Sequence, residues 1–197
     1  PPLWPLGTLR MNEGACDPAG NFWCGSMAYD REAGAASLWR LAISGETEEM
    51  ITDLTISNGL CWSADGTTAF FNDTETYQIS VFDWNPEAGL FNRRVFVDLH
   101  DDDVRPDGLT IDAEGGVWIG LSNGAAVRRY DAAGTLSEVI ELPVTKATAC
   151  TFGGENLDQL FITSSREGLD DDEEPAAGSL FLAEPGVQGL PVLTFGG

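Results

Sequence analysis

The feature that most constrains this chain is an internal repeat. Three stretches, residues 12–23, 58–69 and 107–118, align with one another, and their first residues lie 46 and 49 positions apart. Each copy reads as a polar residue, a short strand, a turn containing glycine, and a second strand with apolar or aromatic residues. A looser fourth copy covers residues 148–163. The fold is therefore expected to stack similar units of about 45 residues.

Further strand-like segments lie between the copies, at residues 37–41, 78–83 and 126–131, and each is followed by turn residues. Amphipathic helical periodicity is nowhere sustained for three turns. Units of four short strands with a period in the forties are typical of the blades of a β-propeller. We predict an all-β propeller with about four blades, forming a single domain over residues 1–197. A β-sandwich with similarly spaced strands is the alternative.

Charge narrows the range of partners. Ten basic residues stand against 32 acidic ones, which gives a net charge of −22, so nucleic acid and anionic membrane surfaces would be repelled. No apolar run approaches the roughly 18 residues of a membrane span, and the first six residues lack the pattern of a signal peptide. We expect a cytoplasmic protein without nucleic-acid or membrane partners. The acidic runs at residues 101–103 and 170–174 are expected to be solvated loops.

Several kinds of site are poorly supported. His100 is the single histidine, and no C-x-x-C pair occurs, which argues against zinc sites built from histidine or paired cysteine. Residues 120–124 match G-x-S-x-G, but a nucleophile elbow requires a following helix, and Asn123-Gly124 is better explained as a hairpin turn. We expect the four cysteines to be buried thiols; they are Cys16, Cys24, Cys61 and Cys150.

The aligned copies place polar residues in one structural position. Asn12, Asn58 and Asp107 each begin a copy, so they should start equivalent strands in successive blades. If those strands are innermost, the three side chains converge on the central axis, where their oxygens would suit a hard divalent cation. Alternatively, each residue caps a turn through its own backbone. The spacing alone leaves both interpretations open.

At these residues the sequence resembles the SMP-30/gluconolactonase/regucalcin-like family. The motifs that carry the resemblance are ordered and extend from residue 10 to about residue 168. They are Arg10-Met11-Asn12-Glu13-Gly14, residues 17–27, residues 56–63, residues 105–118, and Cys150-Thr151-Phe152-Gly153-Gly154.

The resemblance implies a six-bladed propeller that hydrolyses a sugar lactone with a bound divalent cation. In that reading Asn58 and Asp107 are metal ligands, and Asp107 is also the carboxylate that transfers the proton. Arg10 and Asn12 match the positions that hold the sugar hydroxyls. Asp30 falls where some members carry a substrate-contacting glutamate.

The implied partners are a small-molecule lactone and one divalent cation, with calcium as the first candidate and magnesium, manganese or zinc as alternatives. The assembly is expected to be a monomer or a small homo-oligomer. Two other functions stay open: a non-catalytic calcium-binding or interaction propeller, and a phosphotriesterase-type hydrolase.

Two departures from the family pattern matter. Glu13 stands where the family usually has aspartate, which keeps the charge but lengthens the side chain. The family's third metal ligand is a glutamate in a Glu-Gly-Pro motif near the N-terminus, and that motif does not occur here. The resemblance thus implies that the sequence begins about two blades into the fold, with the third ligand expected upstream of Pro1.

Overall fold

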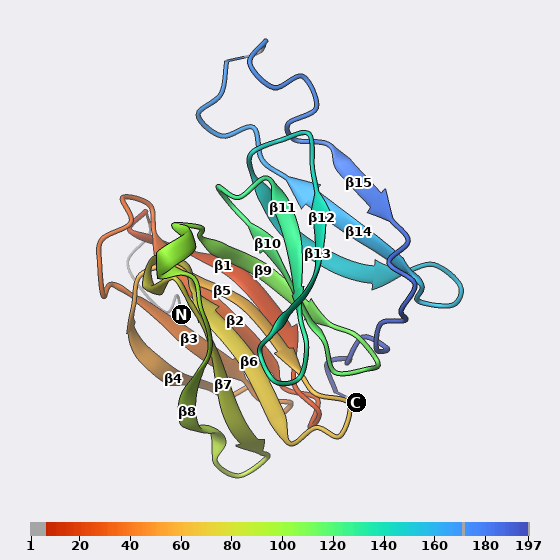
Figure 1. The fold of residues 1–197 in the computed structure, drawn as a ribbon. Coiled ribbons are helices and arrows are strands. Elements are labelled where there is room, and N and C mark those ends of the chain that lie inside the picture. Colours follow the sequence, from red (N-terminus) through yellow and green to blue (C-terminus); the bar gives the residue numbers. More distant parts are fainter. Residues whose placement is uncertain (1–6, 171, 197) are drawn as a thin grey trace.

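Four antiparallel sheets make up the protein (Figure 1). The computed structural model describes residues 7–170 and 172–196. Blade 1 contains β1 (Leu9–Cys16), β2 (Phe22–Ala28), β3 (Ala36–Leu41) and β4 (Thr47–Leu54). Blade 2 contains β5 (Ser57–Trp62), β6 (Thr68–Asp73), β7 (Gln78–Asn85) and β8 (Gly89–Asp98).

Blade 3 contains β9 (Pro106–Ile111), β10 (Val117–Leu121), β11 (Ala126–Tyr130) and β12 (Leu136–Glu141). Blade 4 contains β13 (Ala147–Gly153), β14 (Gln159–Ser164) and β15 (Leu180–Ala183). The helical content of the described residues is two 3-10 turns, η1 (Thr74–Thr76) and η2 (His100–Asp102). The expected strands at residues 37–41, 78–83 and 126–131 are confirmed as β3, β7 and β11 to within a few residues.

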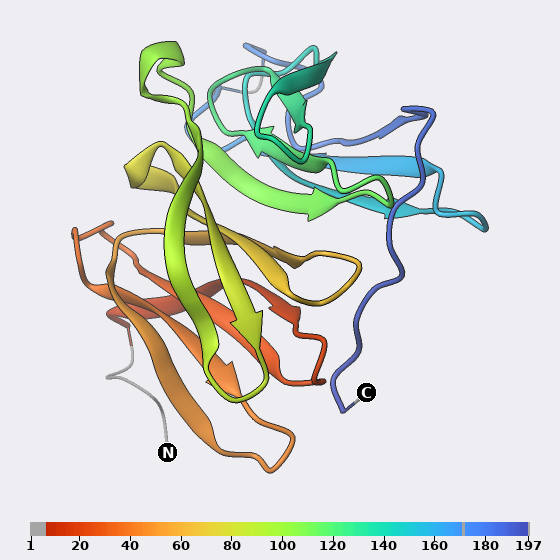
Figure 2. The ribbon, with the colours of Figure 1, turned by 60° about the horizontal axis from the view of Figure 1, so that its bottom comes forward.

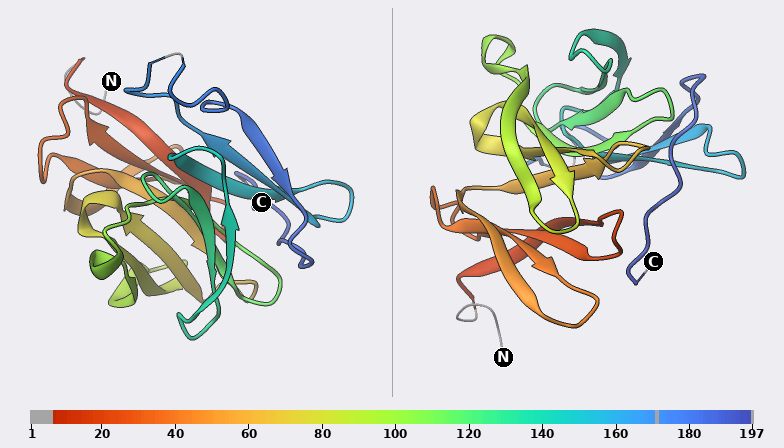
Figure 3. Two further views of the ribbon diagram at one scale, coloured as in Figure 1. Left: turned by 45° about the horizontal axis from the view of Figure 1, so that its top comes forward. Right: turned by 90° about the horizontal axis from the view of Figure 1, so that it is seen from below.

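The blades are arranged around a common axis as in a β-propeller. Strands within each sheet pair in sequence order, and the first strands of neighbouring blades contact one another, β1 with β5, β5 with β9, and β9 with β13. Figures 2 and 3 show these first strands side by side, with the later strands of each blade farther out. The prediction that each repeat begins on an innermost strand is therefore confirmed, and a sandwich is excluded.

Apolar side chains fill the spaces between consecutive blades. One core is shared by blades 1 and 2, and it includes Trp23, Leu60 and Phe71. A second core joins blades 2 and 3, and a third joins blades 3 and 4. Both faces of an inner sheet are thus buried, which explains why β10 is apolar along its whole length except for a glycine.

In two of the blades the aligned turn contains a buried carboxylate that fastens the hairpin. In blade 3, Asp112 accepts hydrogen bonds from the Trp118 indole N–H at 2.8 Å and from Arg129 Nε at 2.7 Å. Burial acts to raise the pKa of Asp112, but these hydrogen bonds outweigh it and lower the pKa. Asp17 and Trp23 repeat the aspartate–indole pair in blade 1 at 2.8 Å. The Asp-x-x-Gly turn in the sequence is therefore the anchor of two of the four blades.

Each innermost strand carries a bulge at its polar repeat position. The pairing with the second strand shifts between Met11 and Gly14 in β1, between Asn58 and Leu60 in β5, and at the corresponding points of β9 and β13. A bulge leaves a residue unpaired and turns its side chain out of the regular alternation. The polar residues of successive blades are turned in this way toward one end of the axis.

Glycines allow the inner strands to approach closely. A Cβ on Gly59 would lie 2.5 Å from Asn72 Nδ2 and from Leu109 Cγ, and one on Gly108 would lie 2.5 Å from the Ala149 Cβ. Such distances are well inside van der Waals contact, so a larger residue would push neighbouring blades apart. The glycine after each polar residue in blades 2 and 3 is thus a packing requirement.

The C-terminal segment returns from blade 4 toward blade 1 (Figure 2). The Gly189 N–H bonds the Leu157 carbonyl at 2.8 Å, and the Gly196 N–H bonds the Gly20 carbonyl at 2.9 Å. All four cysteines are free, but only Cys150 is buried. The other three are partly buried, so the expectation of four buried thiols is wrong for them; Cys16 and Cys61 line a second cavity that leaves their side chains partly accessible. Within the described residues, no helix is long and apolar enough to cross a membrane.

Candidate functional site

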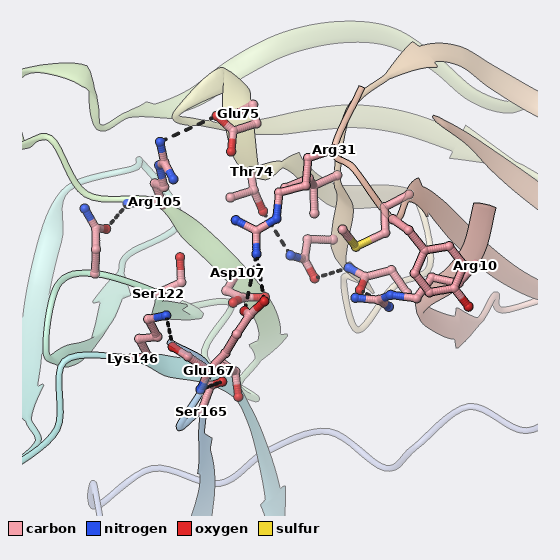
Figure 4. A pocket seen from close by; sticks show the side chains of 17 residues that line it. Arg10, Arg31, Thr74, Glu75, Arg105, Asp107, Ser122, Lys146, Ser165 and Glu167 are labelled. Carbon is pink, nitrogen blue, oxygen red and sulfur yellow. Dashed lines mark hydrogen bonds and ion pairs between the residues drawn. The ribbon is translucent and has the colours of Figure 1, made fainter. Parts of the chain in front are cut away.

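A cavity of about 510 Å³ opens at the end of the axis toward which the bulges point. Its lining includes the polar repeat residues of all four innermost strands, which are Asn12, Asn58, Asp107 and Thr148. Figure 4 shows Asp107 among the side chains around the cavity. The volume falls in the range of sites for small molecules. The predicted convergence of Asn12, Asn58 and Asp107 is therefore seen in the structure.

The three repeat residues form a connected set. Asn12 Nδ2 donates to Asn58 Oδ1 at 3.1 Å and to the Ser57 carbonyl at 3.0 Å. The Asn58 side chain is in turn close enough to the Asp107 carboxylate to act on its pKa, which it lowers. Asn58 is buried, whereas Asn12 and Asp107 are partly exposed to the cavity. The alternative in which each residue caps only its own turn is not what the contacts show, since they join neighbouring blades.

Thr74 fixes the orientation of the Asn58 amide. Its hydroxyl donates to the Pro106 carbonyl at 2.9 Å, so it can only accept from Asn58 Nδ2, which lies 2.9 Å away. The Asn58 amide oxygen must then face Asn12 and the cavity. Thr74 begins η1, directly after β6, and it links blade 2 to blade 3 at this point.

Asp107 is a desolvated carboxylate. Burial raises its pKa from 3.8 to about 7, although hydrogen bonds from the Asn58 side chain and the Gly108 N–H act in the opposite direction. Its main chain is held by Asn72, a fully buried residue of β6 whose Nδ2 donates to the Asp107 carbonyl at 2.7 Å. Asp107 is thus held rigidly while its charge stays poorly compensated by the protein.

Glu13, in β1, is close enough to this carboxylate for the two charges to repel, and it does not line the cavity. Burial raises the pKa of Glu13 to about 7, and repulsion from Asp107 adds to the shift, while a 3.2 Å hydrogen bond from the Gly59 N–H opposes it. Its charge also raises the pKa of the Cys61 and Cys150 thiols, whose own burial is the larger cause. Two acidic groups with raised pKa values therefore share the centre of the fold.

Arg10 lies at the edge of the cavity in β1. Its Nη1 donates to Asn12 Oδ1 at 2.7 Å and to the Met11 carbonyl at 3.1 Å, so it orients Asn12. Asp30 is exposed and is not among the residues that line the cavity, unlike its neighbours Tyr29 and Arg31. The structure thus brings Arg10 together with the three repeat residues and leaves Asp30 at the margin.

The donor set suits a hard divalent cation. Asp107 offers a carboxylate and Asn58 an amide oxygen, and the raised pKa of Asp107 indicates a charge that a cation would neutralise. Within residues 7–170 and 172–196, no three Asp, Glu, His or Cys side chains gather into a metal-binding group. The two oxygens therefore fit part of a cation site, and further ligands would have to complete it.

The other patterns in the sequence do not form catalytic sites. Residues 120–124 end β10 and turn directly into β11, so the interpretation as a hairpin is confirmed. His100 belongs to η2 and its Nδ1 lies 2.6 Å from the exposed Asp98 carboxylate. The His100 ring packs against the Tyr77 ring, and neither His100 nor Asp98 lines the cavity.

Two residues of the site could not be found from the repeat. Thr74 and Asn72 sit at the end of β6, where their residue types are unlike those at the matching positions of the other copies. The remaining signal, a run of polar residues at 72–76 after an apolar strand, also fits an ordinary turn. Only the packing of blade 2 against blade 3 gives them their role.

The amino-acid sequence is similar to proteins of a known family. Residues 4–166 match the model of the SMP-30/gluconolactonase/LRE-like region. Regucalcin of Oryctolagus cuniculus is 35% identical over 199 residues, which cover 95% of this chain and 67% of the relative. The chain therefore spans about two thirds of the length of the regucalcins that it matches.

Solved structures show the same architecture. Regucalcin of Agrobacterium tumefaciens, described as a calcium-binding protein, superimposes with a TM-score of 0.90 at 33% identity, over 96% of this chain and 66% of that one. A luciferin-regenerating enzyme gives 0.88 at 28% identity, over 96% and 66%. A gluconolactonase from Xanthomonas campestris gives 0.66 at 29% identity, over 78% and 53%.

Proposed function

The chain belongs to the SMP-30/gluconolactonase/LRE-like family, and we propose that it is a metal-dependent lactonase that hydrolyses a small sugar lactone. The observation that carries the proposal is Asp107, a desolvated carboxylate with a pKa raised to about 7, set among Asn58, Asn12 and Arg10 at the base of a cavity. A group with a pKa near the working pH can both accept and release a proton.

In the proposed reaction Asp107 takes a proton from the water that attacks the lactone carbonyl carbon. A bond forms between that carbon and the water oxygen, the bond between that carbon and the ring oxygen breaks, and the proton returns to the ring oxygen. The product is the open hydroxy acid. Arg10 and Asn12 orient the substrate hydroxyls, because both present hydrogen-bonding groups at the cavity edge next to Asn58.

A divalent cation held by Asp107 and Asn58 would supply polarisation of the lactone carbonyl when bound. Calcium is the first candidate, and magnesium, manganese and zinc are the alternatives. The complete domain is proposed to be a six-bladed propeller in which two further blades lie upstream of residue 1. Those blades would supply the third ligand.

The test is hydrolysis of D-glucono-1,5-lactone by the complete protein, followed as acid release, with and without chelator. Activity that chelator removes and added cation restores supports the proposal. A binding propeller would take up calcium without turnover. Hydrolysis of an organophosphate in preference to the lactone would assign the site to phosphotriester chemistry instead.

A further inference from the structure

Basic side chains are concentrated around the cavity. The whole chain has ten Lys and Arg residues and a net charge of −22, yet four of the ten line this one cavity: Arg10, Arg31, Arg105 and Lys146. The other basic residues lie elsewhere, and several pair with acidic neighbours, as Arg94 does with Asp83 at 2.7 Å. In so acidic a protein, positive charge at the cavity needs its own explanation.

Two of the four cations are neutralised by contact. Arg31 pairs with Glu167 at 3.1 Å, and Arg105 Nη2 lies 3.7 Å from Glu75. Arg105 is also held by Tyr77, whose hydroxyl accepts from its Nε at 3.0 Å. These two residues therefore bring little net positive charge to the cavity.

Lys146 differs because it has no carboxylate in contact. Its ammonium donates to the Glu167 carbonyl at 2.6 Å. None of the ion pairs among the described residues includes Lys146, and the charge of Glu174 acts on it only from beyond ion-pair distance. An ammonium has three donor hydrogens, so two stay available to a ligand. Lys146 is half-buried and directly precedes β13. A charge of this kind can bind an anion directly.

Lys146 lies across the cavity from the residues proposed to hold the sugar. In Figure 4, Asp107 lies between Arg10 on one side and Ser122 and Lys146 on the other. The Ser122 hydroxyl makes no side-chain hydrogen bond with the described part of the chain, although its N–H bonds the Arg105 carbonyl at 3.0 Å. Lys146 and Ser122 therefore form a second set of donors, on blades 3 and 4.

We propose that this second set, Lys146 with Ser122, is a subsite for an anionic substituent of the substrate, a carboxylate or a phosphate. The inference rests on the proposed lactonase function. With the lactone carbonyl at Asp107 and its ring hydroxyls toward Arg10, the opposite end of the molecule reaches Lys146. Hydroxyls of a neutral sugar would gain little there, whereas an anion accepts charge-assisted hydrogen bonds.

The experiment compares three lactones on the complete protein: D-glucono-1,5-lactone, 6-phospho-D-glucono-1,5-lactone and D-glucaro-1,4-lactone. The ratio of kcat/KM for each anionic lactone to that for the neutral one is measured for the natural protein and for Lys146→Met. We expect the ratio to fall about tenfold to a hundredfold, the usual effect of losing a hydrogen bond to a charged group. The phosphate and carboxylate arms show which anion is preferred.

Two control variants isolate the local effect. Lys146→Arg keeps the charge and should preserve most of the preference. Arg94→Met removes one positive charge from an exposed ion pair in blade 2, so it matches the change in net charge and should leave the ratio unchanged. A ratio that is unaltered in Lys146→Met, or lowered equally in Arg94→Met, overturns the proposal.

Binding of unreactive sugars separates this proposal from the lactonase proposal. Titration calorimetry compares glucose, glucose 6-phosphate and glucuronate on the natural protein and on Lys146→Met. If no lactone is hydrolysed, the lactonase proposal fails, yet tighter binding of an anionic sugar that depends on Lys146 still supports the subsite. Equal binding of all three sugars refutes the subsite, whatever the hydrolysis shows.

Discussion

Replacing Asp107 with asparagine should move activity and stability in opposite directions. Asparagine keeps the shape and one oxygen ligand but removes the charge and the basicity. The pKa of Asp107 is raised from 3.8 to about 7, chiefly by burial. Ionisation of this group is therefore less favourable in the folded protein than in the unfolded chain, and the charge that the proposed chemistry uses costs stability.

The size of the effect follows from the pKa shift. Each pKa unit corresponds to about 1.4 kcal/mol, so a shift of about three units amounts to roughly 4 kcal/mol. Asp107 is partly open to the cavity, and solvent screening reduces the expected gain to about 2–4 kcal/mol. A folded-state pKa above the unfolded value means that stability falls as pH rises from about 4 to about 7. Without metal, the natural protein should therefore be less stable than Asp107→Asn at pH 8.

The measurement is urea unfolding followed by tryptophan fluorescence, with excess chelator, at pH 4 and pH 8. We expect Asp107→Asn to be more stable at pH 8 and nearly equal to the natural protein at pH 4. Asp101→Asn removes the same charge from an exposed turn, and it should leave the free energy of unfolding unchanged at both pH values. The reasoning would be refuted if Asp107→Asn were less stable than the natural protein at pH 8, or if the difference in their free energies of unfolding did not depend on pH.

Hydrolysis by the same variant gives the second half of the prediction. Loss of a general base is typically worth about 10²–10⁴-fold, so lactone hydrolysis at saturating calcium, manganese or zinc should fall by that factor. If excess metal restored nearly natural activity, Asp107 would be a ligand only. Glu13, the adjacent carboxylate with a raised pKa, would then be the next candidate for the base.

Three further predictions concern the surroundings of the site. Arg10→Ala and Asn12→Ala should each lower kcat/KM by the equivalent of about 1.5–3 kcal/mol with unchanged circular dichroism, and natural values on every lactone tried would contradict a substrate role. Thr74→Val should reduce the free energy of unfolding in urea by about 2–3 kcal/mol, because the buried Asn58 amide loses its acceptor. The same variant should bind the cation more weakly in calorimetry. Unchanged cation affinity would mean that the Thr74 hydroxyl does not orient Asn58. Asp112→Ala should cost about 3–5 kcal/mol, because it removes the acceptor of the buried Trp118 indole and one of the two carboxylates paired with the half-buried Arg129. Since the pKa of Asp112 is lowered in the folded state, the loss measured in urea should shrink as pH falls below about 4. A cost that is equal at pH 3 and pH 7 would argue against that pairing.

The repeat was sufficient to predict the architecture because its signals are local. An Asp-x-x-Gly turn, the alternation of the following strand and a tryptophan six residues after the aspartate are set by a few consecutive residues, and Asp112 with Trp118 shows how they close one hairpin. The spacing of the copies then placed Asn12, Asn58 and Asp107 on equivalent strands. Whether these side chains converge on the axis or cap their own turns stayed open in the sequence, and the contacts between the first strands of neighbouring blades decided for convergence.

The sequence could not supply what depends on contacts between blades. The bulges that turn the polar residues into the cavity are irregularities in the pairing of two strands, so neither strand's sequence shows them by itself. Thr74, which fixes the Asn58 amide, acts only because the Pro106 carbonyl lies 2.9 Å away across a blade boundary. Cys61 was expected to be buried like Cys150, but it is only partly buried because it lines a second cavity.

The electrostatics of the site were likewise decided by tertiary structure. Asp107 and Glu13 are ordinary acidic residues in a chain with 32 of them. Burial raises the pKa of each to about 7, and repulsion from Asp107 adds to the shift of Glu13. Lys146 is an ordinary basic residue until blade 4 folds it over the cavity without a carboxylate in contact. The sequence alone states the type of each residue, whereas the solvation and the charged neighbours of that residue come from segments that are distant in the sequence. The chemistry of this site depends on those surroundings, and only the tertiary structure sets them.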